Sequence, residues 1–294
     1  MFDEQQYALL DFGGGRKLER FGPYVLDRPC PAAETETLAH YELWPQSIAR
    51  FVRSAADSGA WSPSHALPDA WTIEHQPWER DRQAPHLRFE LRPTEFGHLG
   101  IFPEQAANWE WLFDWLSRGS AGPRVLNLFA YTGGSTLAAA AAGGQVVHID
   151  AAENIVNWAR RNAELSELDT APVRWITEHV PRFVARELKR GNRYDTIILD
   201  PPSYGHGPKG EAWKLADDLN RLLRDCAELL TGSGRPAIVL SCHTTRWKAT
   251  DLRELLAAAV AKLLRGQLDV DHLWLTTPAG RRLPSGLVAR WYAE

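Results

Sequence analysis

A regular alternation of short apolar runs and longer amphipathic segments begins near residue 120 and constrains the fold of this 294-residue chain more than any other feature. Short apolar runs between helical segments are typical of parallel strands that helices bury on both faces. Two extended runs, 268–275 and 286–292, follow the alternation and predict a closing antiparallel hairpin. The strands are predicted over 125–129, 145–149, 173–177, 196–199 and 237–240, and the helices over 133–142, 153–165, 180–189, 213–230 and 250–264. The sequence therefore predicts an α/β fold with a seven-stranded, mainly parallel sheet.

The first 84 residues have a different character, because proline, glycine and tryptophan interrupt short apolar runs there. Turn signals such as Gly13-Gly14-Gly15 predict a small β-rich N-terminal cap over residues 1–84. Residues 46–60 predict a short helix within this cap. Residues 85–294 are left as the second domain.

Charge and cysteine content exclude several classes of protein. The net charge is −4, and residues 1–90 carry a net charge of −5, so the cap is not predicted to attract RNA through its overall charge. Arg16, Lys17 and Arg20 are candidates for phosphate contacts, with a solvated turn as the alternative. The 3 scattered cysteines make neither a disulfide framework nor a zinc site, so no metal is expected.

The distribution of apolar residues gives no sign of a membrane. No run reaches the roughly 18 apolar residues that a spanning helix needs. The N-terminal segment Met1–Gln6 is acidic and polar, unlike a signal peptide. We therefore expect a cytoplasmic protein without a membrane partner, and its oligomeric state is left open.

Two segments that follow the first two predicted strands point to a nucleoside. Ligands on parallel sheets bind beyond the carboxyl ends of the strands. The first strand is followed by Gly133-Gly134, which lets a ligand approach the backbone, although the G-x-G-x-x-G and phosphate-loop patterns are absent. The second is followed by Asp150, an acid placed to accept hydrogen bonds from ribose hydroxyls. The alternatives are a structural turn and a helix cap, and the combination favours a cofactor that contains a nucleoside.

The segments after the later strands add candidate contacts. Glu178 and His179 could meet an adenine edge, or they could only begin a helix. The rigid turn at 200–204, Asp-Pro-Pro-Ser-Tyr, leaves carbonyls to face a substrate amine or base edge, and the loop 205–210 could close over it. Cys242 is either a nucleophile or a buried small residue.

Taken together, these motifs resemble those of the class I S-adenosylmethionine-dependent methyltransferases, and in particular the bacterial 23S rRNA cytosine-5 methyltransferases. The resemblance rests on residues 129–134 (Phe-Ala-Tyr-Thr-Gly-Gly), the Asp-Pro-Pro of 200–202, and 100–105 (Gly-Ile-Phe-Pro-Glu-Gln). It covers residues 85–245 well. It implies a Rossmann-like sheet and S-adenosylmethionine as cofactor, with S-adenosylhomocysteine as product.

The family's site residues are carried over onto matching positions. The resemblance implies that Asp150 holds the ribose and that Thr132 to Gly134 pass under the methionine part. Asp200 and Pro201 would face the sulfonium and the target, and Cys242 would attack C6 of a cytosine. The complete set implied to bind the cofactor is Phe102, Gln105, Asn127, Phe129, Tyr131, Thr132, Gly133, Gly134, Asp150, Ala151, Glu178, His179 and Asp200.

The sequence departs from the family at three points. Glu104 stands for an aspartate and Ala106 for an arginine, and His179 replaces an aspartate. The N-terminal part resembles only the opening strands of a PUA-like RNA-binding domain, as in a shorter branch of the family. The prediction is a methyltransferase acting on RNA, with cytosine C5 of rRNA favoured. The alternatives are an amine N-methyltransferase acting on a base, protein or small molecule, a non-catalytic cofactor-binding protein, and a nicotinamide oxidoreductase.

Overall fold

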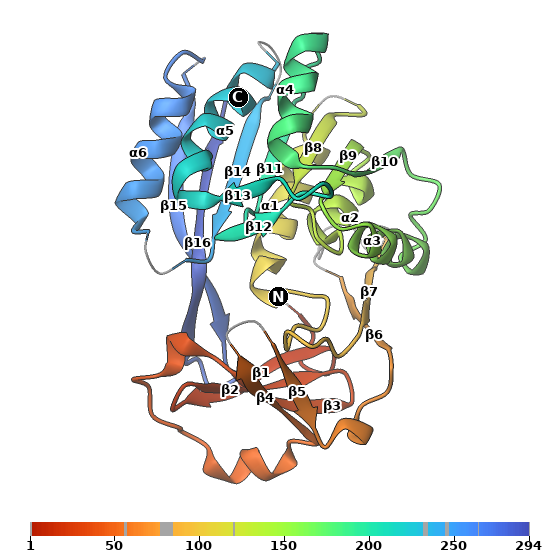
Figure 1. Cartoon of the computed structure of the whole chain (residues 1–294), viewed down its shortest axis with the longest axis vertical. Coiled ribbons are helices and arrows are strands. Elements are labelled where there is room, and N and C mark those ends of the chain that lie inside the picture. Colours follow the sequence, from red (N-terminus) through yellow and green to blue (C-terminus); the bar gives the residue numbers. More distant parts are fainter. Residues whose placement is uncertain are drawn as a thin grey trace. The chain divides into compact units, whose positions relative to one another are not determined.

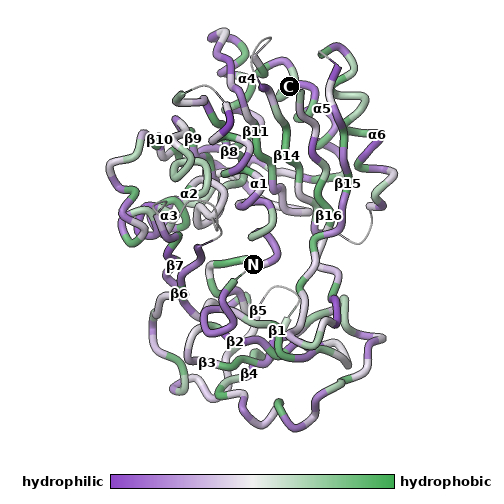
Figure 2. The backbone as a smooth tube through the Cα atoms, turned by 180° about the vertical axis from the view of Figure 1, so that it is seen from behind, coloured by the Kyte–Doolittle hydropathy of each residue, from purple (hydrophilic) through white to green (hydrophobic). Residues whose placement is uncertain are grey.

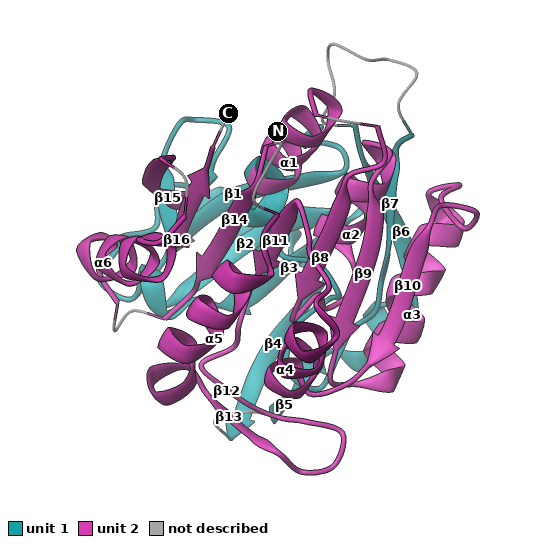
Figure 3. Ribbon diagram, turned by 90° about the horizontal axis from the view of Figure 1, so that it is seen from above, with its two compact units in different colours: residues 1–107, 274–285 teal, residues 108–273, 286–294 magenta. Residues whose placement is uncertain are grey.

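The computed structural model of this protein describes residues 2–55, 58–76, 85–119, 121–231, 235–244, 247–263 and 265–293. The chain forms two compact units, coloured teal and magenta in Figure 3. Unit 1 comprises residues 1–107 and 274–285, and unit 2 comprises residues 108–273 and 286–294. The first division between the units falls after residue 107, and residues 274–285, at the tip of the final hairpin, also belong to unit 1. The domain boundary after residue 84 that the sequence predicts stays a proposal.

Unit 2 is built on the seven-stranded sheet that the sequence predicts, in the order β10-β9-β8-β11-β14-β16-β15 (Figure 1). Strands β8 to β11 and β14 pair in parallel, and β16 pairs antiparallel to β14. The strands are β8 (Arg124–Leu128), β9 (Gln145–Asp150), β10 (Val173–Thr177), β11 (Thr196–Leu199), β14 (Ala237–Cys242), β15 (Gln267–Thr276) and β16 (Arg282–Tyr292). The α/β fold class is confirmed.

Helices of unit 2 cover both faces of the sheet, as expected for buried parallel strands. The helices are α1 (Ala106–Ser117), α2 (Gly134–Ala141), α3 (Glu153–Leu165), α4 (Val180–Arg190), α5 (Leu215–Leu229) and α6 (Ala249–Val260). The central strands β11 and β14 are hydrophobic along their length (Figure 2), because residues on both of their faces are buried. No helix among the described residues is long and apolar enough to cross a membrane.

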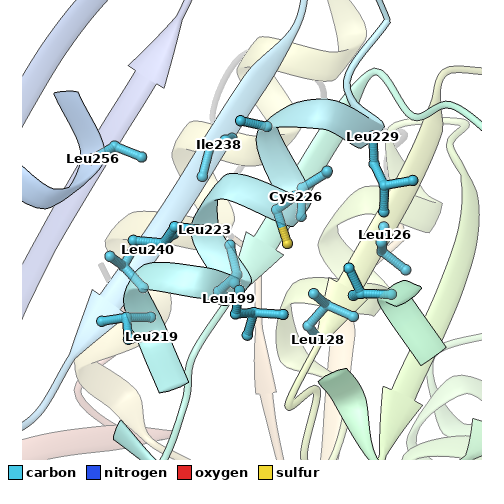
Figure 4. Packing of buried hydrophobic residues seen from close by; sticks show 14 of the residues in the cluster. Leu126, Leu128, Leu199, Leu219, Leu223, Cys226, Leu229, Ile238, Leu240 and Leu256 are labelled. Atoms are coloured by element: carbon cyan, nitrogen blue, oxygen red, sulfur yellow. The ribbon is translucent and has the colours of Figure 1, made fainter. Parts of the chain in front are cut away.

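The main core of unit 2 lies between the sheet and helices α4, α5 and α6. Leu199 and Leu240 from the strands pack there with Leu223 and Cys226 from α5 (Figure 4). All four side chains have no measurable exposure. The core fixes the helices on the strands and so fixes the turns at the strand ends, where the candidate site lies.

Unit 1 contains a five-stranded sheet in the order β1-β2-β3-β4-β5 and a separate hairpin of β6 and β7. The strands are β1 (Tyr7–Gly13), β2 (Arg16–Phe21), β3 (Tyr24–Pro29), β4 (Ala49–Ala55), β5 (Ser58–Ser62), β6 (Trp71–His75) and β7 (Leu87–Leu91). The predicted helix over 46–60 is wrong. Phe51 and Trp61 are cross-strand partners whose rings meet edge to face at 5.3 Å, and this packing favours strands.

The tip of the final hairpin belongs to unit 1 through Arg281. Its guanidinium donates hydrogen bonds to Asp11 Oδ1 at 2.7 Å and to the Thr37 carbonyl at 2.9 Å. It also lies 4.1 Å from the centre of the Phe12 ring. These contacts join residues more than 240 positions apart in the sequence, so the periodicity of either segment does not predict them.

A buried ionic cluster holds β1, β2 and β3 together. Glu19 is fully buried and accepts hydrogen bonds from Tyr7 Oη at 2.9 Å and Arg28 Nε at 2.8 Å. Lys17 Nζ lies 3.1 Å from the same carboxylate. Burial alone would raise the pKa of Glu19, but the charges of Arg28 and Lys17 lower it below its ordinary value.

Replacing Glu19 with glutamine is expected to destabilise unit 1 by about 3–5 kcal/mol, because Arg28 would remain buried without its counter-charge. The measurement is chemical denaturation followed by tryptophan fluorescence. Glu90→Gln, at a carboxylate that pairs with the exposed Arg92, is the control and should change stability by less than about 1 kcal/mol. Equal stability of the two variants would contradict the prediction.

Candidate active site

Asp150 ends β9 and receives two backbone hydrogen bonds. Tyr131 N–H donates to Oδ2 at 2.9 Å and Ala152 N–H donates to Oδ1 at 3.1 Å. Desolvation by burial raises the pKa of this carboxyl above its ordinary value, against the effect of these bonds. Each oxygen keeps a lone pair, so the carboxylate can accept a pair of hydroxyl groups.

The loop between β8 and α2 has an unusual backbone. Phe129 has φ of 56° and Tyr131 has φ of 48°, and Gly133 has φ of 93°. Positive φ at aromatic residues costs free energy, and such strain concentrates at ligand sites. The loop turns the Tyr131 N–H toward Asp150, to which it donates a hydrogen bond. The strain is an independent sign that the segment serves a ligand rather than a simple connection.

Two positions of this loop favour glycine, Gly134 because of packing and Gly133 mainly because of its positive φ. A Cβ at Gly134 would come 2.4 Å from the ring of Trp109, and one at Gly133 would come 3.2 Å from Cβ of Ala159. The buried side chain of Asn162 donates to the Thr132 carbonyl at 2.9 Å. Trp109 and Asn162 thus support the loop, although nothing in the local sequence identifies either of them as a site residue.

Asn127 is buried and faces helix α2. Its amide donates to Thr136 Oγ1 at 2.8 Å, and that hydroxyl lies 2.9 Å from His148 Nδ1. Ala151 follows Asp150 at the end of β9 and is partly exposed. The structure therefore brings Phe129, Tyr131, Thr132, Gly133, Gly134, Asp150 and Ala151 together at one edge of the sheet, and Asn127 lies beneath them.

Glu178 and His179 follow β10 and differ in their partners. Glu178 forms a two-pronged ion pair with Arg186, and Arg182 lies 3.7 Å from the same carboxylate. The Nε2 atom of His179 is buried and has no hydrogen-bond partner among the residues that the structure describes. Because the carboxylate of Glu178 is occupied by cations, His179 is the better candidate for a contact with a ligand.

The turn of Asp200, Pro201 and Pro202 follows β11 and is anchored by Trp213. The indole N–H of Trp213 donates to the Pro202 carbonyl at 2.8 Å, and its ring packs 4.8 Å from Phe129. These contacts correct the expectation that the carbonyls flanking the prolines face a substrate. The Pro202 carbonyl is engaged, and in the described part of the chain only the Pro201 carbonyl of the two prolines accepts no hydrogen bond.

The loop expected over 205–210 is partly a hairpin. Strands β12 (Tyr204–His206) and β13 (Ala212–Lys214) pair antiparallel, and α5 begins at Leu215 rather than at the predicted residue 213. Tyr204 is 55% exposed, and its hydroxyl lies 2.9 Å from His206 Nε2. The hairpin therefore presents an exposed aromatic ring beside the Asp-Pro-Pro turn.

His243 is a site residue to which the sequence assigned no role. Its Nε2 lies 3.1 Å from Asp200 Oδ1, and both side chains are about one-third exposed. A Cβ on Gly286 of β16 would come 2.8 Å from His243 Nδ1, so the glycine leaves space for the imidazole. Because β11 and β14 are neighbours, their ends bring Asp200 and His243 together.

Cys242 lies in the hydrophobic core rather than at the site surface. It is 1% exposed and packs in the same cluster as Leu240. Burial raises the pKa of its thiol, and the charge of Asp200 raises it further. A nucleophilic cysteine needs the thiolate form and access to its target, and the burial of Cys242 opposes both.

Phe102 and Gln105 belong to unit 1. The ring of Phe102 meets His98 edge to face at 5.2 Å, and Gln105 is 5% exposed. In the described ranges no group of three His, Cys, Asp or Glu side chains could hold a metal ion.

Comparison with known proteins identifies the family. A family model described as S-adenosylmethionine-dependent methyltransferase matches residues 77–255. The solved SAM-dependent methyltransferase from Agrobacterium tumefaciens is 34% identical, with a TM-score of 0.88 over 98% of this chain and 91% of that one. A Streptococcus mutans structure with a TM-score of 0.74 is 18% identical and supports the likeness of fold alone.

The similar curated proteins are ribosomal RNA methyltransferases. Methyltransferase K/L of Hahella chejuensis is 35% identical over 58% of this chain, and methyltransferase I of Aeromonas hydrophila is 39% identical over 28%. This chain spans only 23% and 21% of their lengths.

The strained glycine loop and Asp150 fit a cofactor that contains a nucleoside, since the glycines allow close approach to the backbone and the carboxylate can accept ribose hydroxyls. This fit agrees with the family match over residues 77–255, which is more than half of the chain. The chain therefore belongs to the S-adenosylmethionine-dependent methyltransferase family, and it is an enzyme that uses S-adenosylmethionine as its methyl donor.

Proposed function

We propose that this enzyme methylates a base of RNA, and that the acceptor is an exocyclic amine. The observation that carries the choice of acceptor is the pair of Asp200 and His243 beside the Asp-Pro-Pro turn, with Cys242 buried behind it. Ribosomal RNA as the substrate class is supported by the names of the curated relatives. Cytosine C5, which the sequence favours, is the second candidate, because Cys242 is the last residue of the fifth parallel strand, at the same sheet edge as Asp200.

The cofactor contacts are assigned from the same geometry. We propose that Asp150 accepts hydrogen bonds from the ribose hydroxyls and that the backbone of Thr132, Gly133 and Gly134 lies against the methionine part. His179 meets the adenine, while Glu178 holds helix α4 through Arg186. Phe102 and Gln105 are retained as the proposed lid. When bound, the cofactor supplies an electrophilic methyl group on a sulfonium.

The residues of the chain then act mainly by positioning. The Asp200 carboxylate accepts one N–H of the amine, and the Pro201 carbonyl is available for the second, which directs the nitrogen lone pair at the methyl carbon. The bound cofactor would supply the methyl group to the amine nitrogen, and its sulfur would keep the electron pair of the broken C–S bond. The surplus proton on nitrogen passes to the Asp200 carboxylate, which His243 orients. Tyr204 stacks on the base, which must leave its helical stack to enter the site.

The direct test uses labelled S-adenosylmethionine and unmodified ribosomal RNA, followed by digestion and identification of the labelled nucleoside. An N-methylated base would support the proposal, and 5-methylcytidine would replace it with the second candidate. If RNA takes up no label while S-adenosylhomocysteine still stabilises the protein, the acceptor is a protein or small molecule instead.

Replacing Cys242 with alanine is expected to leave the rate of RNA methylation within about threefold of the wild-type value. The thiol lies in the core and performs no step on an amine, and its replacement leaves only a small cavity. The rate is measured with saturating cofactor. Cys226→Ala, at another buried core cysteine, is the matched control for the packing change. A loss of 1000-fold or more in the Cys242 variant alone would establish the C5 mechanism.

A further inference from the structure

Unit 1 contains a cavity of about 130 Å³ whose lining includes Phe102 of the proposed lid, while its other residues have no role in the proposed methyl transfer. It is lined by side chains from β2, β3 and β4 and from the segment 96–104. The lining residues that matter here are Lys17, Arg28, Arg53, Phe96, Phe102 and Glu104. The cavity combines cations, aromatic rings and one carboxylate, and such a combination is unusual for a purely structural gap.

The cavity has more positive charge than the neighbouring carboxylates neutralise. Arg28 is buried and committed to Glu19, which lies behind the cavity wall. Lys17 also contacts Glu19 but uses only one of its three N–H donors there. Arg53 is exposed and forms no ion pair within the described residues. With Glu104 counted, the charges in and behind the wall leave a surplus of one positive charge.

An exposed aromatic ring stands at the edge of the cavity. Phe96 is 54% exposed at the tip of a turn that is closed by hydrogen bonds from Gly97 N–H to the Thr94 carbonyl and from Thr94 N–H to the His98 carbonyl. Gly97 has φ of 77°, and a Cβ there would come 2.7 Å from the ring of Phe51. These contacts fix the turn, so the ring of Phe96 lies in water beside the cations of the cavity, where it is accessible for stacking.

The remaining polar groups limit what the cavity can bind. Desolvation of the ring, together with the charges of Arg28, Lys17 and Arg53, lowers the pKa of His98 to about 4. His98 is therefore neutral near pH 7 and can donate or accept a hydrogen bond, but it adds no charge. The Glu104 carboxylate accepts hydrogen bonds and disfavours a ligand that is anionic throughout. A fitting ligand carries one phosphate, a flat ring and an N–H group.

We infer that this cavity binds one nucleotide of a single-stranded RNA segment, other than the nucleotide that is methylated. Its base stacks on Phe96, its amino edge faces Glu104, and its phosphate lies between Arg53 and Lys17. Single-stranded RNA is recognised in this way, by stacking on exposed rings and by cations along the backbone. The inference rests on the proposed function, and it adds a substrate contact made by unit 1 alone.

The test measures the affinity of the full chain, with S-adenosylhomocysteine present, for a fluorescent single-stranded RNA of ribosomal sequence at several salt concentrations. Phe96→Ala should weaken binding about tenfold with little change in the salt dependence, because stacking is lost. Arg53→Ala should weaken binding and also reduce the slope of log K against log salt by about one, because one phosphate contact is lost. Cofactor affinity and thermal stability should not change in either variant.

Two exposed residues of unit 1 outside the cavity provide matched controls. Tyr41→Ala removes a ring that is 71% exposed, and Arg88→Ala removes a cation on β7. Equal behaviour of the cavity and control variants, with wild-type RNA binding intact, would overturn the inference and leave the proposed function standing. If the wild-type protein neither binds nor methylates RNA, both fall. If a free mononucleotide binds as tightly as the RNA and loses affinity in Phe96→Ala, the ligand is a free nucleotide and the RNA assignment is wrong.

Discussion

Replacing Asp150 with alanine is expected to weaken the binding of S-adenosylhomocysteine by about 100-fold or more. Hydrogen bonds to a charged group contribute about 1.5–3 kcal/mol each, and we propose two from the ribose. The same carboxylate also holds the strained loop through Tyr131 N–H, so its removal lets the loop relax toward a conformation that does not bind. Isothermal titration calorimetry at pH 7.5 gives the affinity directly.

Two variants separate the charge of Asp150 from its position. Asp150→Asn keeps one acceptor oxygen and should bind with intermediate affinity. Glu153→Ala removes a nearby exposed acid from the first turn of α3 and should bind as the wild type does. Burial raises the pKa of Asp150, and hydroxyl groups bind the ionised carboxylate better than the protonated form. When the pH is lowered, the affinity of the wild type should therefore begin to fall at a higher pH than it would with an ordinary aspartate. This pH dependence should be absent in Asp150→Asn, and an Asp150→Ala variant with wild-type affinity would remove Asp150 from the site.

The sequence predicted the unit 2 sheet because its local and global signals agree. The runs 173–177 and 196–199 are apolar, short and flanked by helical periodicity, and they are strands at those limits. Residues 46–60 gave no such agreement. Their apolar residues fit either period, and the pairing of β4 with β5 and with the more distant β3 decides for strands.

Site residues that lie at the end of a strand could be predicted from the sequence. Site residues that reach the site only through tertiary packing could not. Asp150 and Asp200 were identifiable because parallel strands deliver their last residues to one edge. Asn162 supports the loop from helix α3, and Trp213 anchors the prolines from the second strand of a hairpin. No spacing rule links these residues to their partners. Cys242 was ambiguous for a related reason, since only the packing shows that its thiol faces the core.

Replacing Asp200 with alanine is expected to lower kcat for RNA methylation by about 1000-fold while cofactor affinity changes by less than about threefold. The proposed role of this carboxylate is to orient the amine and take its proton, and groups aimed at charge that develops during reaction contribute about 100- to 1000-fold each. The Pro202 carbonyl is held by Trp213 independently of the Asp200 side chain, so the turn should keep its shape. Single-turnover rates with saturating cofactor and RNA are the measurement.

Variants of His243 test the same proposal further, because the proposed role of His243 is to orient the Asp200 carboxylate. His243→Ala should lower kcat about tenfold, by releasing the carboxylate from its 3.1 Å contact, and His243→Gln should restore part of the rate through its amide N–H. In the Asp200→Ala background a second change at His243 should have almost no effect, since a residue that only positions Asp200 has nothing left to position. Additive losses in the double variant would mean that His243 contacts the acceptor itself. If the Asp200→Ala variant methylates RNA at the wild-type rate, other groups orient the acceptor. The structure would then no longer support an amine over cytosine C5 as the acceptor.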